Sequence, residues 1–221
     1  MSPQEAEWFG RILCRVAPAE LSPLLNLGSS TLDYRTTACP HIEKSLMRPL
    51  IDRGVQILNM DLKDAPGVDI VGDILDPVVR ARILSIGVKA ILCNNLLEHV
   101  TDVPAMCNAL AETCPAGGTL CLSVPHAFPF HPDPIDNGFR PSLSDLEGIF
   151  TPLGFRVDYG EVVTFGSYGQ SIFSNPILLV RDAYLMSLSP FNREKRQVFL
   201  GNYAFLLKTF KVSCVLLTKT K

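Results

Sequence analysis

The stretch NMDLKDAPGVDIVGD, residues Asn59–Asp73, contains the ends of two apolar runs and is the first indication of the fold class. Both VQILNMD (55–61) and VDIVGD (68–73) have the short, apolar composition of buried strands. Each run closes on an aspartate, Asp61 or Asp73. Ligands of open α/β sheets bind beyond the carboxyl ends of the strands. The two carboxylates are therefore either groups that hold a bound molecule or solvated turn residues.

Strand-like and helical patterns alternate along the rest of the chain. Strands are expected at 22–30, 55–61, 68–73, 88–95, 118–125, 155–166 and 210–219. Helices are expected at 39–54, 76–87, 101–118 and 142–154, and Pro49 is expected to shorten or kink the first of them. The repeated β-α-β order predicts a doubly wound, mostly parallel α/β sheet with helices on both faces.

The composition is that of a single α/β domain. The 221 residues are 47% hydrophobic and carry a net charge of −2, so no nucleic-acid partner is expected. No apolar run approaches the ~20 residues of a membrane span. Within the domain, residues 1–22 are expected to form a lead-in helix, and residues 166–209 an apolar helical insertion before the last strand.

The cysteines indicate a reducing environment. There are seven, an odd number, and no two of them have CxxC spacing. Several lie in apolar, strand-like runs, where a thiol behaves as a small hydrophobic group. The first residues also lack the basic and apolar regions of a signal peptide. These features predict reduced thiols and a cytoplasmic location.

The turn after the first predicted strand indicates the kind of ligand. Gly28 is followed by the small residues Ser29 and Ser30, and such a turn lets a ligand approach the backbone amides. The dinucleotide fingerprint G-x-G-x-x-G is missing, because only Gly28 of its glycines is present. An adenosine cofactor without phosphates therefore fits better than NAD.

The two aspartates complete an adenosine site. Asp61 can accept hydrogen bonds from both hydroxyls of a ribose, and Asp73, beside Ile74, can accept from the adenine amine. Each residue taken alone is as well explained by a surface turn or a helix cap. Their occurrence at successive strand ends favours a site.

Taken in order, the motifs resemble those of class I S-adenosylmethionine-dependent methyltransferases of the broad type 11 group. The resemblance covers roughly residues 23–165, with 210–219 as the last strand, and rests on LLNLGSS, NMDLKDAPGVDIVGDI, CNNLLEHV and PAGGTLCLSVP. It implies a Rossmann-like sheet with an antiparallel last strand, and S-adenosyl-L-methionine as the cofactor.

The resemblance also implies a set of cofactor-binding residues: Asn26, Gly28, Ser29, Ser30, Asp61, Leu62, Asp73, Ile74, Asn94, Asn95 and Leu96. In this set Leu62 packs on the adenine, and the residues after the fourth strand lie beside the sulfonium. Glu98 and His99 match the family's EH pair, which is expected to support the site or only to pack the helix. The first motif departs from the family, because Asn26 stands where an acid usually recognises the cofactor's amino group.

Methyl transfer from a sulfonium is an in-line displacement at carbon, and an oxygen or nitrogen nucleophile benefits from a base. His126 and His131 are the candidate bases, because they lie in the Pro-rich loop after the fifth strand and histidine titrates near neutral pH. Asp133 and Asp136 in the same loop are further candidates, or act only as turn and cap residues. The spacing of these groups matches no compact metal-binding motif, so no metal is expected.

The sequence thus predicts methyl transfer to an oxygen or nitrogen of a small-molecule or glycan acceptor. One alternative is a lipid or quinone-like acceptor with peripheral membrane contact, which the apolar segment 166–209 favours. That segment could also pack on the sheet or form a homodimer surface. Another alternative is a catalytically inactive, methyltransferase-like binding module, which the depleted first motif favours: Asn26 replaces the acid, and Ser30 and Leu32 stand at later glycine positions. A nicotinamide dehydrogenase is disfavoured by the missing glycines.

Overall fold

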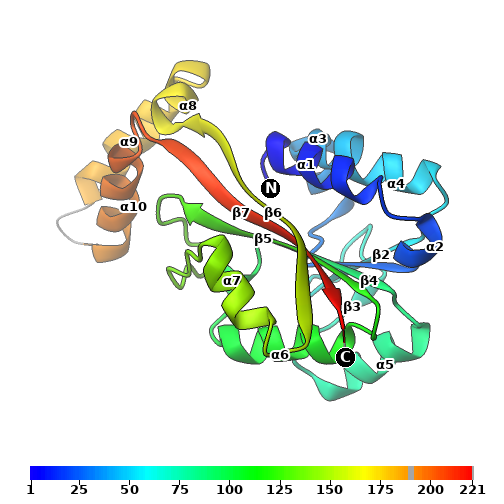
Figure 1. Ribbon diagram of the computed structural model, residues 1–221. Coiled ribbons are helices and arrows are strands. Elements are labelled where there is room, and N and C mark those ends of the chain that lie inside the picture. Colours follow the sequence, from blue (N-terminus) through cyan, green and yellow to red (C-terminus); the bar gives the residue numbers. More distant parts are fainter. Residues whose placement is uncertain (189–191, 221) are drawn as a thin grey trace.

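The computed structural model describes residues 1–188 and 192–220. Within these ranges, seven strands form one sheet in the order β3-β2-β1-β4-β5-β7-β6 (Figure 1). The strands are β1 (Leu24–Leu27), β2 (Ile57–Asp61), β3 (Ile70–Val71), β4 (Ala90–Asn94), β5 (Thr119–Ala127), β6 (Phe155–Ser167) and β7 (Thr209–Lys219). Strands β1 to β5 pair in parallel, and β7 runs antiparallel to β5 and β6. The predicted doubly wound, mostly parallel sheet with an antiparallel last strand is confirmed.

The order of the strands creates a natural place for a ligand. Strand β1 pairs with β2 on one side and with β4 on the other. The chain builds from β1 out to β3, then crosses back to β4 and continues toward the opposite edge. The connections that leave β1 and β4 therefore diverge, and the carboxyl ends of these strands form the topological switch point where such sheets bind ligands.

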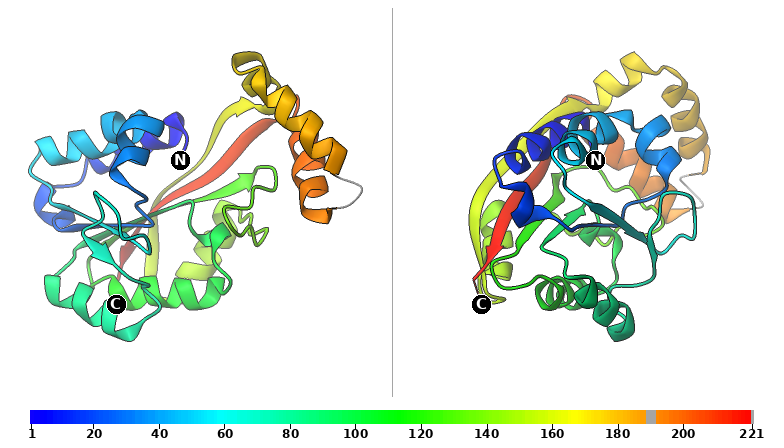
Figure 2. Two further views of the ribbon diagram at one scale, coloured as in Figure 1. Left: turned by 180° about the vertical axis from the view of Figure 1, so that it is seen from behind. Right: turned by 90° about the vertical axis from the view of Figure 1, so that its right-hand side faces the viewer.

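Helices cover both faces of the sheet, as predicted (Figures 1 and 2). One face carries α1 (Pro3–Leu13), α2 (Pro18–Leu21), α3 (Pro40–Ile42) and α4 (Arg48–Asp52), and the other carries α5 (Pro77–Ile86), α6 (Val103–Thr113) and α7 (Leu143–Phe150). Strand side chains alternate between two cores. Leu24 and Leu92 pack with α1, whereas Leu25 and Ile91 pack with the helices of the opposite face.

The predicted helix 39–54 contains a π-helical segment just before Pro49. Its parts are α3, the π-helix η2 (Glu43–Met47) and α4, in whose first turn Pro49 lies. Because proline has no N–H, it cannot donate to the carbonyl of Ser45, four residues earlier. That carbonyl packs closely on Gly10 of α1, where a β-carbon would lie 2.0 Å from the oxygen. Pro49 therefore changes the local hydrogen bonding, and the chain continues as helix through Asp52.

Strands β6 and β7 form a long ribbon that carries three helices away from the rest of the sheet (Figure 2). These are α8 (Tyr168–Ser174), α9 (Ile177–Leu188) and α10 (Arg193–Ala204). Buried Asp182 on α9 accepts a hydrogen bond from the hydroxyl of Tyr168 on α8 and forms an ion pair with its neighbour Arg181. Arg181 also donates to the Tyr168 hydroxyl, so both side chains tie α9 to α8. Among the described residues, none of the helices has both the length and the apolar character needed to cross a bilayer.

All seven cysteines are free, and five of them are buried. Burial raises the pKa of the Cys107 thiol to about 11 and that of Cys114 to about 12. Burial also raises the pKa of the thiols of Cys93, Cys121 and Cys214, which lie in strands. At neutral pH these groups are uncharged and pack as small apolar side chains, as the sequence predicts for the strand cysteines.

Candidate active site

A cavity of about 520 Å³ lies beyond the carboxyl ends of β1, β4 and β5. This volume is within the range of small-molecule and cofactor sites. The start of α1 contributes Ser2 and Glu5 to its wall, and Tyr34 and Arg35 come from the π-helix η1 (Tyr34–Ala38) that follows β1. Phe128, Phe165, Val212, Ile42 and Met47 supply apolar lining. The cavity thus combines apolar surface with polar groups from several distant segments.

The turn after β1 has the conformation that a backbone-binding site requires. Gly28 has φ +70°, and a β-carbon there would lie 3.2 Å from Leu96 Cδ1, so both conformation and space favour glycine. Ser30 also has a positive φ, +54°. Arg35, which is buried, donates to the carbonyls of Ser29 at 2.9 Å, Ser30 at 2.7 Å and Gly67 at 2.8 Å. This guanidinium therefore fixes the turn at the wall of the cavity.

Asp61 is anchored at the end of β2 by two backbone amides. Its Oδ2 accepts from the N–H of Ser30 at 2.7 Å, and its Oδ1 accepts from the N–H of Lys63 at 3.1 Å. Since each carboxylate oxygen can accept a further hydrogen bond, the anchored group still has capacity for a ligand. The first contact also links Asp61 directly to the turn after β1.

Eight of the eleven expected cofactor residues line this one cavity: Asn26, Gly28, Ser29, Ser30, Asp61, Asn94, Asn95 and Leu96. Leu62, Asp73 and Ile74 are not among its lining residues. Strand β3 has only two residues, so the chain has left the sheet before Asp73, whose Oδ1 accepts from the N–H of Leu75. Ile74 is buried in the core, and Leu62 is 70% exposed.

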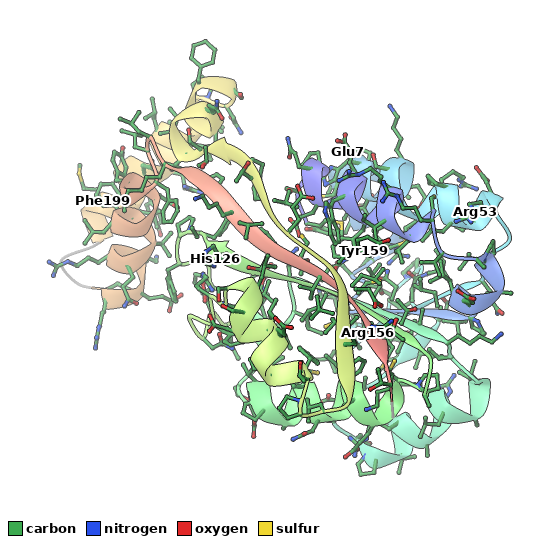
Figure 3. All side chains as sticks on the ribbon, in the orientation of Figure 1. Glu7, Arg53, His126, Arg156, Tyr159 and Phe199 are labelled. Atoms are coloured by element: carbon green, nitrogen blue, oxygen red, sulfur yellow. The ribbon has the colours of Figure 1, made fainter. Side chains whose placement is uncertain are left out.

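The two candidate bases lie in different places. His131 lines the cavity, and its Nδ1 lies 3.0 Å from the carbonyl of Pro129. His126 lies at a bulge of β5, and its Nδ1 lies 3.1 Å from the carbonyl of Pro141, in the loop before α7 (Figure 3). A bulge redirects a side chain, and here the ring turns toward α7 and away from the cavity. His126 is therefore not among the residues that line the cavity, and its role as a base stays a prediction.

Asp136 and Arg140 organise the loop that carries His131. Arg140 Nη2 binds Asp136 Oδ2 at 2.6 Å, and the same carboxylate accepts from the N–H of His131 at 2.9 Å. Although burial opposes it, the hydrogen bonds from Arg140 and from the backbone hold the pKa of Asp136 below its usual range. Arg140 therefore pairs with Asp136 within this loop.

Glu5 is a cavity residue that sequence reasoning missed. It is 1% exposed, and its Oε2 accepts from the N–H of Ser2 in a capping box at the start of α1. Its Oε1 accepts from Nδ2 of Asn95, after β4, at 2.9 Å. The S-x-x-E pattern at Ser2 predicts the cap. That the same carboxylate reaches the end of β4 follows only from the packing of α1.

Two further polar groups in the cavity have unsatisfied atoms. Within the described part of the chain, Asn94 Nδ2 and both carboxyl oxygens of Glu98 are buried without a hydrogen-bond partner on another residue. Glu98 lies in the 3₁₀ turn η3 (Leu97–His99). Burial raises the pKa of Glu98 to about 8, and the charge of Arg140 only partly offsets this. Unsatisfied buried groups are rare in folded proteins, so these atoms at the wall of the cavity are candidates to bind a ligand, a water molecule or an ion.

Solved structures with the same architecture identify the fold. An S-adenosylmethionine-dependent methyltransferase from Archaeoglobus fulgidus matches over 97% of this chain and 94% of its own length, at 12% identity and TM-score 0.53. The 1,6-didemethyltoxoflavin-N1-methyltransferase of Burkholderia thailandensis was solved with S-adenosylhomocysteine. It matches over 97% of this chain and 80% of its own length, at 12% identity and TM-score 0.51. The chain has the class I methyltransferase fold.

This methyltransferase fold does not by itself fix the reaction. The [4+2]-cyclase SpnF is also similar, over 95% of this chain and 81% of its own, at 14% identity and TM-score 0.55. No protein-family model matches the sequence, and no curated protein matches it. The activity of this class I methyltransferase fold therefore has to be argued from its cavity.

Proposed function

We propose that the protein transfers a methyl group from S-adenosyl-L-methionine to an oxygen or nitrogen atom of a small-molecule or glycan acceptor. The observation that carries the proposal is the cavity at the switch point of a class I methyltransferase fold, lined together by Gly28, Asp61 and Asn95. A water-poor cavity that orients the sulfonium and the acceptor contributes about 7–11 kcal/mol to such a displacement.

In this proposal the backbone from Gly28 to Ser30 binds the methionine moiety. Asp61 accepts from the ribose hydroxyls with the lone pairs that its two backbone contacts leave free. Leu62, which is exposed beside Asp61, packs on the adenine. Asp73 binds the adenine edge outside the cavity together with the backbone amide of Ile74, whose side chain is buried in the core. Asn94, Asn95 and Leu96 lie beside the sulfonium.

Glu5 takes the role of the acid that the first motif lacks. Asn26 is uncharged, and its Nδ2 donates to Asn59 Oδ1 at 2.9 Å, so its amide serves strand pairing. Glu5 is a buried carboxylate in the same cavity and is fixed by Asn95. A carboxylate held in this way suits the ammonium group of the cofactor. His131 is the candidate base, because burial lowers its pKa and leaves the imidazole neutral at pH 7.

Calorimetric titration with S-adenosylhomocysteine tests the proposal. We expect micromolar binding, at least about tenfold weaker in Asp61→Asn, because each lost ionic hydrogen bond contributes roughly 1.5–3 kcal/mol. Asp64→Asn is the matched control, since Asp64 is exposed in the same loop and does not line the cavity. Absence of binding to protein that circular dichroism shows to be folded would contradict the proposal and favour the inactive binding module.

A lipid or quinone-like acceptor is the second candidate. Large apolar side chains stand exposed on and after α8–α10, among them Phe173 at 90%, Val180 at 70% and Leu207 at 91%. Exposed apolar groups of this kind support contact with a membrane surface or with a second copy of the chain. Co-sedimentation with anionic lipid vesicles would support contact with a membrane surface. A dimeric mass measured by light scattering would support contact with a second copy of the chain.

A further inference from the structure

Three side chains with metal-binding atoms meet at one side of the cavity. Glu98 and His99 come from the turn η3 after β4, and His131 comes from the loop after β5. One donor atom from each of the three lies within 4.8 Å of the others. The rings of His99 and His131 meet edge to face, with centroids 5.1 Å apart. More than thirty residues separate the two histidines in sequence, so this cluster exists only in the folded chain.

The hydrogen bonds of the two histidines leave the same nitrogen free. His99 Nδ1 contacts the carbonyl oxygen of Ile135, and His131 Nδ1 contacts that of Pro129. A carbonyl oxygen only accepts, so each Nδ1 carries the proton and donates it. Each Nε2 then presents a lone pair. Ligation by one nitrogen while the other donates to a backbone carbonyl is the usual arrangement of metal-binding histidines.

Glu98 supplies the independent observation. It is 0% exposed, and neither carboxyl oxygen has a hydrogen-bond partner on another described residue. Its Oε1 lies 3.7 Å from His99 Nε2, which is too long for a hydrogen bond. Arg140, which could offset the charge, is bound to Asp136. An acceptor oxygen that faces an acceptor nitrogen in a buried site is stabilised when a proton or a cation lies between them.

We propose that Glu98, His99 and His131 bind a divalent first-row transition-metal ion, with Zn²⁺ as the representative. Two imidazoles and one carboxylate are a donor set that such ions prefer, whereas Mg²⁺ prefers oxygen ligands. Donors around a tetrahedral Zn²⁺ with bonds of about 2.1 Å lie about 3.4 Å apart. Binding therefore draws the donor atoms together by up to about 1.4 Å, from the 4.8 Å within which they lie to about 3.4 Å, and the partly exposed His131 can provide this movement.

Three protein ligands leave a coordination position open toward the cavity, and this position suits an acceptor hydroxyl. The role that follows rests on the proposed methyl transfer, whereas the metal site itself does not. Coordination lowers the pKa of the hydroxyl, which releases its proton to solvent. The oxygen lone pair then forms the C–O bond as the C–S bond breaks, which gives the methyl ether, S-adenosylhomocysteine and one proton. His131 then acts as a ligand, and the acceptor class narrows to hydroxyl compounds.

Direct titration of chelator-treated protein with ZnCl₂, followed by calorimetry, tests the site. We expect one equivalent to bind with micromolar or tighter affinity, and MgCl₂ to give no comparable binding. Glu98→Gln and His131→Ala should each weaken Zn²⁺ binding at least about tenfold. His126→Ala is the matched control, because His126 faces Pro141 outside the cavity.

Co²⁺ provides a second readout, because coordination by two imidazoles and a carboxylate produces visible absorption bands that the Glu98 and His131 variants should lose. The site is excluded if folded protein fails to bind Zn²⁺, or if the control and the ligand variants bind it equally. S-adenosylhomocysteine binding is measured in parallel on metal-free protein. Protein that binds S-adenosylhomocysteine but not Zn²⁺ would show that the metal site has failed. Protein that binds Zn²⁺ but not S-adenosylhomocysteine would show that the proposed methyl transfer has failed.

Discussion

Glu5 Oε1 accepts a hydrogen bond of 2.9 Å from Asn95 Nδ2, and so joins the first helix to the end of β4 at the wall of the cavity. The contact fixes a carboxylate where the cofactor's ammonium group is expected. We predict that Glu5→Gln, which is close to isosteric, weakens S-adenosylmethionine binding at least about tenfold, because a charge-assisted hydrogen bond contributes roughly 1.5–3 kcal/mol.

Glu7→Gln is the control for this variant, because Glu7 lies on the outer side of the same helix (Figure 3) and does not line the cavity. Calorimetry should give this control wild-type affinity. Equal affinities of the wild type, Glu5→Gln and Glu7→Gln for S-adenosylmethionine would show that Glu5 does not bind the cofactor.

Arg35 is expected to preserve the turn after β1. Arg35→Lys loses the planar fork that reaches three carbonyl groups, and a lysine ammonium cannot reproduce it. We expect a lower melting temperature and at least about fivefold weaker cofactor binding, measured by differential scanning fluorimetry and calorimetry. Arg53→Lys is the comparison: Arg53 donates to the carbonyls of Leu13 and Val16, away from the cavity (Figure 3), and its replacement should leave binding unchanged.

Gly10 is expected to be required for the packing of α1. In Gly10→Ala the added β-carbon would lie 2.0 Å from the carbonyl oxygen of Ser45, so α1 must move. We predict a loss of about 1–3 kcal/mol in the free energy of unfolding, measured by urea denaturation, although alanine favours helix over glycine by about 1 kcal/mol. In α7, Gly148 has open space at this position, so Gly148→Ala should instead stabilise by about 0.5–1 kcal/mol.

Glu98 makes stability depend on pH in metal-free protein. Its pKa rises from the ordinary 4.5 in the unfolded chain to about 8 in the folded one, mainly because the side chain is desolvated. The folded state therefore holds the proton more tightly. The contribution of Glu98 is most favourable below pH 4.5 and is lost as the pH rises toward 8, by up to about 1.4 kcal/mol per unit.

Glu98→Gln removes this dependence. With a chelator present, urea unfolding should give the variant and the wild type similar stability near pH 5. The variant should be more stable by a few kcal/mol near pH 8.5. A stability difference that does not change with pH would show that Glu98 titrates normally.

Local patterns in the sequence predicted most of the fold. Apolar runs of strand length predicted where the parallel strands lie. The helix expected at 76–87 is also present as α5, capped by Asp76, whose Oδ1 accepts from the N–H of Val78. The turn at Gly28 and the carboxylate of Asp61 were also expected from their places at strand ends, and both line the cavity. Caps, turns and alternation depend on contacts between near neighbours in the chain, so they can be inferred from sequence alone.

The tertiary structure decided which side chains share the cavity. The shortness of β3 left Asp73 outside it, and the bulge in β5 turned His126 away. Packing of distant segments brought in Glu5 and Arg35, and placed His131 beside Glu98 and His99. These outcomes depend on where helices and loops pack against the sheet, and no pattern within one segment specifies the position of another.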